Sequence, residues 1–231
     1  MQGQPIVRPL WGCSRSVVLA FCGAVAVLAV SAFFVALALD LHLVRVLVKP
    51  WPVLALALWV YAAGRRPYAG PIVIGLLLSA AGDVLLELSA ATFLPGVGAF
   101  LLAHVAYIVA FVGEEQRVRW LRALPFAIWG VAVVLWLRPG LDAAGMLIPV
   151  AIYTATICAM MWRAVARLGN GDRGARLAAV GAVVFAASDT LIAIQRFGDD
   201  LAFQGIRVAI MVLYWFGQTL LAASAVKSPT R

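Results

Sequence analysis

Residues 17–39 read VVLAFCGAVAVLAVSAFFVALAL, a run without a charged side chain that is apolar on every face of a helix. At about 1.5 Å of rise per residue, a helix of this length crosses the roughly 30 Å of hydrocarbon in a bilayer. A transmembrane barrel would instead show short strands of alternating polarity. The run therefore predicts a membrane-spanning helix, and its length favours a retained first span over a cleaved signal peptide.

The same pattern recurs along the whole chain. Its 231 residues are 65% apolar and 12% charged, a balance that a water-soluble domain could not hide beneath its surface. Polar breaks and short loops separate the apolar runs, and no soluble domain is inserted between them. We therefore predict an all-α, polytopic transmembrane bundle that forms one integral membrane domain over residues 1–231. The expected spans are 17–39, 46–63, 71–90, 95–113, 120–137, 144–163, 176–195 and 203–225.

The basic residues are unevenly divided between alternate loops. The net charge is +8, but the arginines lie in short loops, where they set orientation, so nucleic acid is not an expected partner. Thirteen of the 18 basic residues fall on one side of the predicted membrane. Because cytoplasmic loops are enriched in Lys and Arg, we predict a multi-pass protein of the cell membrane with both termini in the cytoplasm. The five basic residues on the other side are Arg45, Lys49, Arg138, Arg196 and Arg207.

Two similar stretches, SAAGDVLLEL at 79–88 and FAASDTLIAI at 185–194, each place an aspartate inside an apolar span. An ionisable side chain near the middle of a bilayer costs roughly 2.5–3.5 kcal/mol, so such residues usually face a bundle interior or a water-filled cavity. Asp83 and Asp189 therefore predict one shared polar site, in the half of the membrane away from the cytoplasm. The alternative is that each carboxylate only ties helices together, with Lys49, Arg196 or a hydroxyl group as its partner.

The spacing of these two stretches keeps their spans in the same orientation, as a four-plus-four parallel duplication would require. Outside these stretches, the internal similarity is limited to a weak sequence similarity between the fourth and eighth spans. Because both stretches are rich in Ala and Leu, chance similarity is the competing explanation.

Other polar side chains recur on the faces of the spans. Glu87 lies one turn beyond Asp83, and His104 and Tyr107 share a helical face near mid-membrane. Such groups could line one cavity or form an inert hydrogen-bonded network. The spacing of HxxxH and HExxH zinc sites is absent, so neither a metal ion nor another cofactor is expected. The remaining polar candidates for the site are Tyr153, Tyr214 and Gln218.

Several polar motifs follow one another from the second to the eighth span. They are Lys49-Pro50, GDVLLEL at 82–88, GAFLLAHVAYIVAF at 98–111, SDTLIAIQRF at 188–197, and Tyr214 with Gln218. This series resembles the YhhN family of lysoplasmalogenases, whose members are multi-helix membrane proteins. The resemblance implies an enzyme that hydrolyses the vinyl-ether bond of lysoplasmalogens, releasing a fatty aldehyde and glycerophospho-ethanolamine or glycerophospho-choline. The expected partners are then a lysophospholipid substrate and the membrane lipids.

The polar residues suit the implied reaction. Vinyl-ether hydrolysis needs a proton delivered to carbon, and water then captures the resulting oxocarbenium ion. Two carboxyl groups can divide this work, one as a protonated acid and the other as an ionised base that orients water. We expect Asp83 and Asp189 to share these roles in either order, and His104 and Tyr107 to orient or relay protons. The substrate-binding candidates, of which the first two would hold the phosphate, are Lys49, Arg196, Glu87, Tyr153, Tyr214 and Gln218.

The alternative function is a proton-coupled carrier of a small molecule or lipid, because paired intramembrane carboxylates also build transport sites. Few glycines or prolines interrupt the middle of the polar spans, whereas many carriers have broken helices at the substrate site. A purely structural protein would leave the clustered polar residues unexplained. Product formation in detergent separates enzyme from carrier, since a carrier needs a sealed compartment and an enzyme does not.

Overall fold

The structure is a computed structural model that describes residues 15–64, 67–169, 172–198 and 205–226. These residues form nine α-helices and two short 3₁₀ turns, and no strand occurs among them. The 3₁₀ turns lead into the fifth and sixth helices. The helices are α1 (Arg15–Ala38), α2 (His42–Val48), α3 (Trp51–Ala63), α4 (Ala69–Leu88), α5 (Phe93–Glu114), α6 (Leu124–Ala143), α7 (Leu147–Ala166), α8 (Arg173–Phe197) and α9 (Ile206–Ala225).

Eight helical segments of the described chain are long and apolar enough to cross a bilayer, which confirms the predicted all-α bundle of eight spans. The second span consists of two helices, α2 and α3, that meet at Lys49-Pro50. Pro50 caps α3 and Pro52 lies in its first turn, where the missing N–H of proline leaves no hydrogen bond unmet. Helix α6 continues past the predicted residue 137 to Ala143, and an Arg138–Asp142 pair one turn apart supports this extension.

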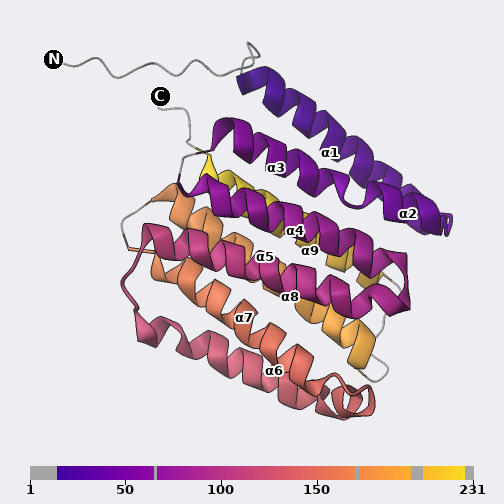
Figure 1. The fold of residues 1–231 in the computed structure, drawn as a ribbon, viewed down its shortest axis with the longest axis vertical. Coiled ribbons are helices and arrows are strands. Elements are labelled where there is room, and N and C mark those ends of the chain that lie inside the picture. The colour runs from indigo at the N-terminus through magenta and orange to yellow at the C-terminus, as the bar shows by residue number, and fades with distance from the viewer. Residues whose placement is uncertain (1–14, 65–66, 170–171, 199–204, 227–231) are drawn as a thin grey trace.

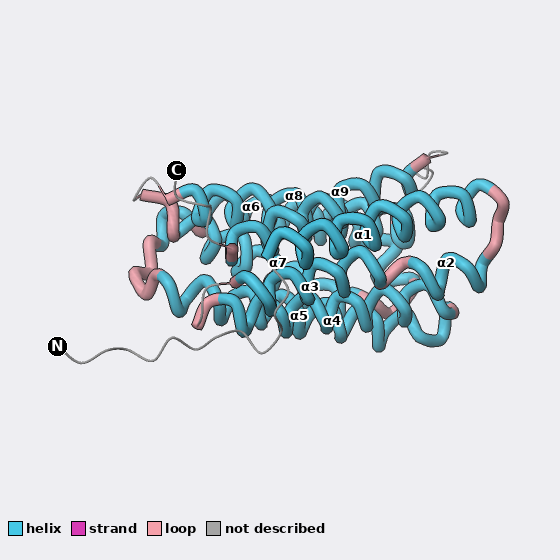
Figure 2. Tube along the Cα trace, turned by 90° about the horizontal axis from the view of Figure 1, so that it is seen from above, coloured by secondary structure: helices cyan, strands magenta, loops and turns pink. Residues whose placement is uncertain are grey.

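The long helices lie side by side with their axes close to parallel, α1 at one edge of the molecule and α6 at the other (Figure 1). Helices α4 and α5 lie on one side of the bundle and α8 and α9 on the other, as Figure 2 shows. The first residue of α1 and the last residue of α9 lie at the same end, as an even number of spans requires. Helices α4 and α8 run in the same direction, as predicted from the spacing of the two stretches that contain Asp83 and Asp189. Which end faces the cytoplasm stays a prediction.

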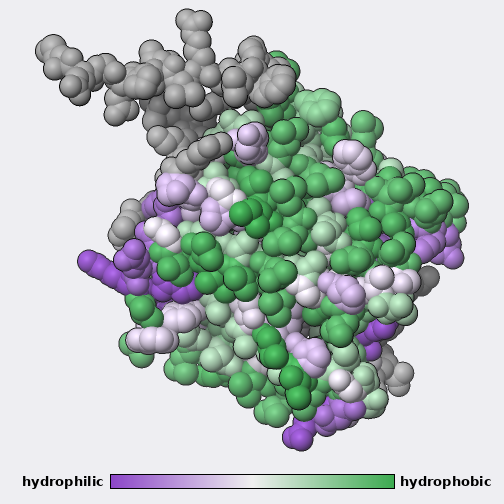
Figure 3. All heavy atoms as spheres, viewed as in Figure 1, coloured by the Kyte–Doolittle hydropathy of each residue, from purple (hydrophilic) through white to green (hydrophobic). Residues whose placement is uncertain are grey.

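The surface of the bundle is that of a protein embedded in lipid. Apolar side chains cover the middle of the face in Figure 3, and hydrophilic side chains gather toward the ends of the helices. Only 17% of the α1 span and 11% of the α6 span is buried, against 56% of the α9 span. Exposed side chains on α1 and α6, such as Leu28, Ile128 and Val131, are apolar. The chain is therefore a multi-pass membrane protein with α1 and α6 at its periphery.

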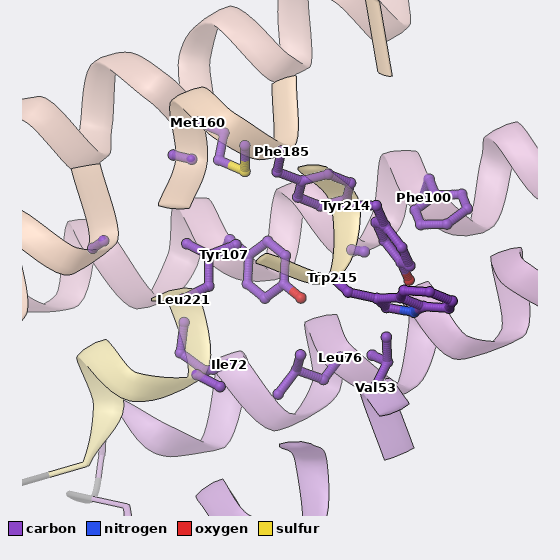
Figure 4. Packing of buried hydrophobic residues seen from close by; sticks show 14 of the residues in the cluster. Val53, Ile72, Leu76, Phe100, Tyr107, Met160, Phe185, Tyr214, Trp215 and Leu221 are labelled. Carbon is purple, nitrogen blue, oxygen red and sulfur yellow. The ribbon is translucent and has the colours of Figure 1, made fainter. Parts of the chain in front are cut away.

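The centre of the bundle is filled by aromatic rings from α5, α8 and α9 (Figure 4). The centroid of the Phe185 ring lies 5.5 Å from that of Tyr214 and 6.1 Å from that of Phe100. Tyr107 approaches the same ring edge-on at 6.5 Å. Aromatic pairs at these separations favour tilted and edge-to-face arrangements over flat stacking. This cluster fixes the spacing of the three helices that carry most of the predicted polar residues.

Helices α8 and α9 approach each other closely at Gly181 and Gly217. A Cβ atom at Gly217 would lie 2.9 Å from the backbone nitrogen of Phe185 and 3.1 Å from the carbonyl oxygen of Gly181. Small residues at such crossings let helix backbones pack against each other inside membranes. The close contact between α8 and α9 therefore depends on the absence of a side chain at residue 217.

We expect Gly217→Ala to destabilise the fold by about 1–3 kcal/mol, because the added methyl group has no free volume. Gly98→Ala on α5 is the matched control, since nothing lies within 4 Å of its Cβ position. At that position the better helix propensity of alanine should stabilise the protein by up to about 1 kcal/mol. Thermal unfolding in detergent compares the two variants, and equal unfolding temperatures would contradict the close packing of α8 on α9.

Candidate active site

Asp189 on α8 lies in a buried polar cluster with residues from two other helices. The hydroxyl group of Tyr153, on α7, donates a 2.9 Å hydrogen bond to Oδ2 of Asp189. Nε2 of His104, on α5, lies 3.3 Å from the same oxygen. The His104 side chain is fully buried, and its ring stacks on that of Phe185 with 4.8 Å between centroids. Three helices thus hold one carboxyl group in a fixed position.

The hydrogen bonds of His104 define where its protons lie. Nδ1 is 2.6 Å from the carbonyl oxygen of Phe100. A carbonyl oxygen only accepts, so Nδ1 carries a hydrogen, and a neutral His104 presents a bare Nε2 toward Asp189. Nε2 has no regular hydrogen-bond partner among the described residues. Nε2 lies 3.3 Å from Asp189, so a proton on either group would let the two hydrogen-bond. The Asp189–His104 pair is therefore placed to share a proton.

Asp83 on α4 is the more deeply buried aspartate, with 2% of its surface exposed against 8% for Asp189. The hydroxyl group of Tyr214, on α9, donates a 2.7 Å hydrogen bond to its Oδ2. Asp83 and Asp189 thus each accept a hydrogen bond from a tyrosine hydroxyl on a neighbouring helix, and not from Lys49 or Arg196. A hydroxyl partner is also what the purely structural alternative predicts, so one site shared by the two aspartates stays a prediction.

Tyr107 and Gln218 belong to a neighbouring network. The Tyr107 hydroxyl donates to Oε1 of Gln218 over 2.7 Å, and Nε2 of Gln218 donates to the Ser79 hydroxyl over 3.0 Å. All three side chains are buried. Within the described part of the chain, the hydrogen bonds of Tyr107 and Gln218 join them to this network and not to either aspartate. His104 and Tyr107 share a helical face, as predicted, but they bond to different partners.

Glu87 organises a group of cations at the end of the bundle where α4 terminates. Its carboxylate accepts hydrogen bonds from Arg45 at 2.9 Å, from Lys49 at 3.2 Å and from Arg207 at 2.9 Å. The Arg45 guanidinium also pairs with the exposed Asp40 at 2.9 Å. Three cations thus meet one buried carboxylate, which leaves an excess of positive charge.

A cavity of about 380 Å³ opens beside these cations, and we call it the cationic pocket. The guanidinium of Arg196, which lines the pocket, lies 4.6 Å from the centroid of the Phe93 ring. Arg207 was predicted on the same side of the membrane as Lys49 and Arg196 but not as a site residue, because nothing in the sequence distinguishes it from an arginine that faces water. The polar side chains of the pocket are Lys49, Glu87, Gln195, Arg196 and Arg207.

A second, smaller cavity adjoins the cationic pocket, and we call it the apolar chamber. It holds about 50 Å³ and shares Leu86, Phe93 and Ile192 with the wall of the cationic pocket. Asp189 and Tyr153 lie in its otherwise largely apolar lining. Of the two aspartates, Asp189 is the one that lines either of these cavities. Asp189, with His104 3.3 Å away, therefore lies at the wall of an apolar space next to a pocket lined by cationic side chains.

This arrangement suits an amphiphilic molecule with an anionic head, an apolar tail and an acid-sensitive bond between them. The cationic pocket can bind the anion through charge-assisted hydrogen bonds. The Asp189–His104 pair can exchange a proton with a molecule bound in the apolar chamber, which Asp189 lines. Within residues 15–64, 67–169, 172–198 and 205–226, no group of three or more His, Cys, Asp or Glu side chains is placed to hold a metal ion.

Comparisons with known proteins agree on one family. The sequence model of the YhhN family matches residues 44–225. The chain is 33% identical over 193 residues to human "Lysoplasmalogenase TMEM86B", a match that covers 79% of this chain and 76% of the human protein. It is 34% identical over 195 residues to bovine "Lysoplasmalogenase TMEM86A", covering 80% of this chain and 79% of the relative. It is 36% identical over 160 residues to a Mycobacterium tuberculosis "Lysoplasmalogenase", covering 66% of this chain and 59% of that protein. No solved structure matches.

Proposed function

The chain belongs to the YhhN family, and we propose on this basis that it is an intramembrane hydrolase of the cell membrane. Its substrate is a lysoplasmalogen, whose vinyl-ether bond it cleaves to give a fatty aldehyde and a glycerophospho-alcohol. The observation that carries the proposal is the Asp189–His104 pair at the wall of the apolar chamber. A proton donor at this position meets the first requirement of vinyl-ether hydrolysis, which is protonation of carbon.

The comparisons favour this enzyme over the carrier. Relatives named as lysoplasmalogenases share 30–36% identity with most of this chain. A carrier must also open at both ends in turn, whereas the end of the bundle opposite Glu87 is tied together by Arg167. Its guanidinium donates a 2.7 Å hydrogen bond to Tyr68, lies 4.5 Å from the centroid of that ring, and lies 3.8 Å from Glu114. Buried cation–π contacts of this kind can contribute about 2 kcal/mol.

Substrate binding places the phosphate in the cationic pocket and the vinyl ether in the apolar chamber. Arg196 follows Asp189 by seven residues on α8, so the two side chains share one helical face about 10 Å apart along the axis. A glycerol backbone between a phosphate and an ether oxygen is shorter than this separation, and the long side chain of Arg196 can reach toward the phosphate. The carboxylate of Glu87 can take the ammonium group of an ethanolamine or choline head, because it faces the same pocket.

The proposed reaction divides the work between the two carboxyl groups. The Asp189–His104 pair gives its proton to the outer carbon of the double bond, which is the one not bonded to oxygen. The inner carbon, which is bonded to the ether oxygen, then becomes part of an oxocarbenium ion. The ionised Asp83 stabilises this cation electrostatically and, through an intervening water molecule because it does not line the chamber, takes a proton from the water that attacks the inner carbon. The hemiacetal then collapses as the Asp189–His104 pair takes the proton of its hydroxyl group and Asp83 returns its proton to the glycerol oxygen, so that the aldehyde and the glycerophospho-alcohol separate. One water molecule is consumed, and both carboxyl groups regain their starting protonation.

We expect Arg196→Ala to raise KM about tenfold and to change kcat little, because a charge-assisted hydrogen bond to phosphate contributes about 1.5–3 kcal/mol to binding. Arg138→Ala is the matched control, since Arg138 lies on the same side of the membrane but pairs with Asp142 outside the pocket. Initial rates over a range of substrate concentrations give both constants. An equal rise in KM for both variants would argue against a phosphate site at Arg196.

Release of fatty aldehyde tests the proposed function directly. The detergent-purified protein is incubated with lysoplasmenyl-ethanolamine, and the products are measured by mass spectrometry. We expect free aldehyde from this substrate and none from the saturated alkyl-ether analogue, which has no double bond to protonate. If folded protein released no aldehyde in detergent, the result would contradict vinyl-ether hydrolysis, and proton-coupled transport would be the better explanation.

A further inference from the structure

The apolar chamber is the smallest of the spaces that the substrate could occupy. Its volume of about 50 Å³ compares with about 380 Å³ for the cationic pocket and about 510 Å³ for an apolar groove lined by α6 and α8. The walls of the chamber are formed by α4, α5, α6, α7 and α8. A long alkenyl chain therefore has more room beyond the chamber than in it.

We propose that the alkenyl chain passes from the chamber into the bilayer between α6 and α8, and that Trp129 is the residue that separates the two spaces and admits the chain. This inference rests on the proposed function. An apolar groove of about 510 Å³, which we call the lateral groove, lies on the other side of Trp129. Trp129 and Thr190 line both the groove and the chamber. The other residues of the groove are Pro125, Phe126, Met161, Val183, Ala186, Ala187, Leu191 and Leu213.

The two residues at this boundary suit the passage of a hydrocarbon chain. Trp129 is partly buried and lies in the peripheral helix α6. The hydroxyl group of Thr190 donates a 2.7 Å hydrogen bond to the carbonyl oxygen of Ala186 in its own helix. The polar atom of Thr190 is therefore satisfied locally, so a passing chain would leave no hydrogen bond of this residue broken.

A second apolar groove, of about 490 Å³, lies between α6 and α7 and shares Thr154 with the chamber. Direct contacts between α6 and α7 narrow the route on that side. A Cβ atom at Gly130 of α6 would lie 2.6 Å from Sγ of Cys158 on α7, so these two helices are in close contact. The Cys158 thiol also donates to the carbonyl oxygen of Phe126 over 3.1 Å. Toward α8, the lateral groove lies between the start of α6, at Pro125, Phe126 and Trp129, and α8. The α6 span is also the least buried of the eight described spans.

The order of the three spaces matches the order of the groups in a lysoplasmalogen. The cationic pocket, with Lys49 and Arg196, receives the phosphate, and the chamber with Asp189 receives the vinyl ether. The lateral groove, which has little polar lining, then receives the hydrocarbon chain. A substrate could diffuse laterally from the membrane into this path without its chain crossing water.

Photo-crosslinking tests the chain path without requiring turnover. The probe is an alkyl-ether lysophosphoethanolamine with a diazirine at the end of its chain, which the proposed chemistry cannot cleave. After irradiation in detergent, we expect labelled peptides from α6 and α8 around Trp129 and Leu191, and we expect excess unlabelled alkyl-ether lipid to suppress the labelling. Labelling of α1 to α3, or labelling that the competitor does not reduce, would overturn the path.

A pair of substitutions on α6 sharpens this test. Val133 lines the chamber, whereas Ile128 is 62% exposed and lines neither the chamber nor the lateral groove. We expect Val133→Trp to lower both labelling at α8 and kcat/KM for a long-chain substrate about tenfold, because the larger side chain fills the chamber. Ile128→Trp should change neither. Equal effects of the two variants would overturn the assignment of the chamber.

The outcomes separate this inference from the proposed function. Aldehyde release together with labelling outside α6 and α8 would retain the hydrolase and reject the chain path. Labelling around Trp129 without aldehyde release would retain a lipid site at this seam and reject vinyl-ether hydrolysis. Thermal unfolding of the wild type and both variants confirms that folded proteins are being compared.

Discussion

Asp189→Asn is expected to reduce kcat for aldehyde release by about 10²–10⁴, the usual contribution of a general acid. An asparagine at this position cannot hold or give up the proton that the Asp189–His104 pair carries. Because Tyr153 and His104 both contact Oδ2, the amide can turn its oxygen there to accept from Tyr153 or its nitrogen there to donate to Nε2 of His104, but not both. One of these contacts is kept, so the loss should appear mainly in turnover and only slightly in stability. Aldehyde release and thermal unfolding, measured on the same preparation, check both expectations.

Asp142→Asn is the matched control for this variant. Asp142 is an exposed aspartate of α6 whose partner is Arg138, outside the proposed site. Its amide variant should retain the activity of the wild type. An Asp189→Asn protein as active as the Asp142→Asn protein would mean that the reaction uses another proton donor.

Asp83→Asn should lower kcat by at least about 10², because the amide can neither stabilise the oxocarbenium ion nor take a proton from water. The hydrogen bond from Tyr214 can be kept, since the amide oxygen also accepts, so the fold should persist. Tyr214→Phe is the companion variant, which removes the hydrogen-bond donor but leaves the carboxylate in place. We expect its loss of activity to be smaller. If Asp83→Asn retained full activity while Asp189→Asn did not, Asp83 would have a structural role and the reaction would use one carboxyl group.

The spans could be predicted from the sequence because a helix that crosses the hydrocarbon of a bilayer needs about 20 consecutive, mainly apolar residues. The length of runs such as 17–39 favours a membrane-spanning helix over a signal peptide, and helical spacing correctly placed Glu87 one turn beyond Asp83. The break between α2 and α3 was harder to predict, because Pro50 and Pro52 are compatible both with a helix start and with a kinked span.

The partners of the two aspartates could not be predicted, because they come from other helices. Tyr153 reaches Asp189 from α7, and Tyr214 reaches Asp83 from α9. These pairs depend on how the helices pack, which in turn depends on close contacts such as that of Gly217 with Gly181. Tyr107 illustrates the same limit. Its helical face was predicted, but packing turned it toward Gln218.

The polar residues of the cationic pocket were only partly predictable for a related reason. Lys49, Glu87 and Arg196 could be grouped because all three fall near the same end of their spans. Arg207 falls there too, but nothing in one sequence distinguishes an arginine that enters a pocket from one that faces water. Its 2.9 Å contact with Glu87 is visible only when α4 and α9 are placed side by side.

The most direct test of the account is the fate of the oxygen atom of water during turnover. Acid-catalysed hydrolysis adds water to the vinyl carbon, so the bond between the ether oxygen and the glycerol carbon stays intact. When the purified protein acts on lysoplasmenyl-ethanolamine in water labelled with oxygen-18, we expect the glycerophospho-ethanolamine released to carry no label. Label in its newly formed hydroxyl group would mean that water displaces the glycerol carbon instead. That result would contradict protonation of the double bond by the Asp189–His104 pair.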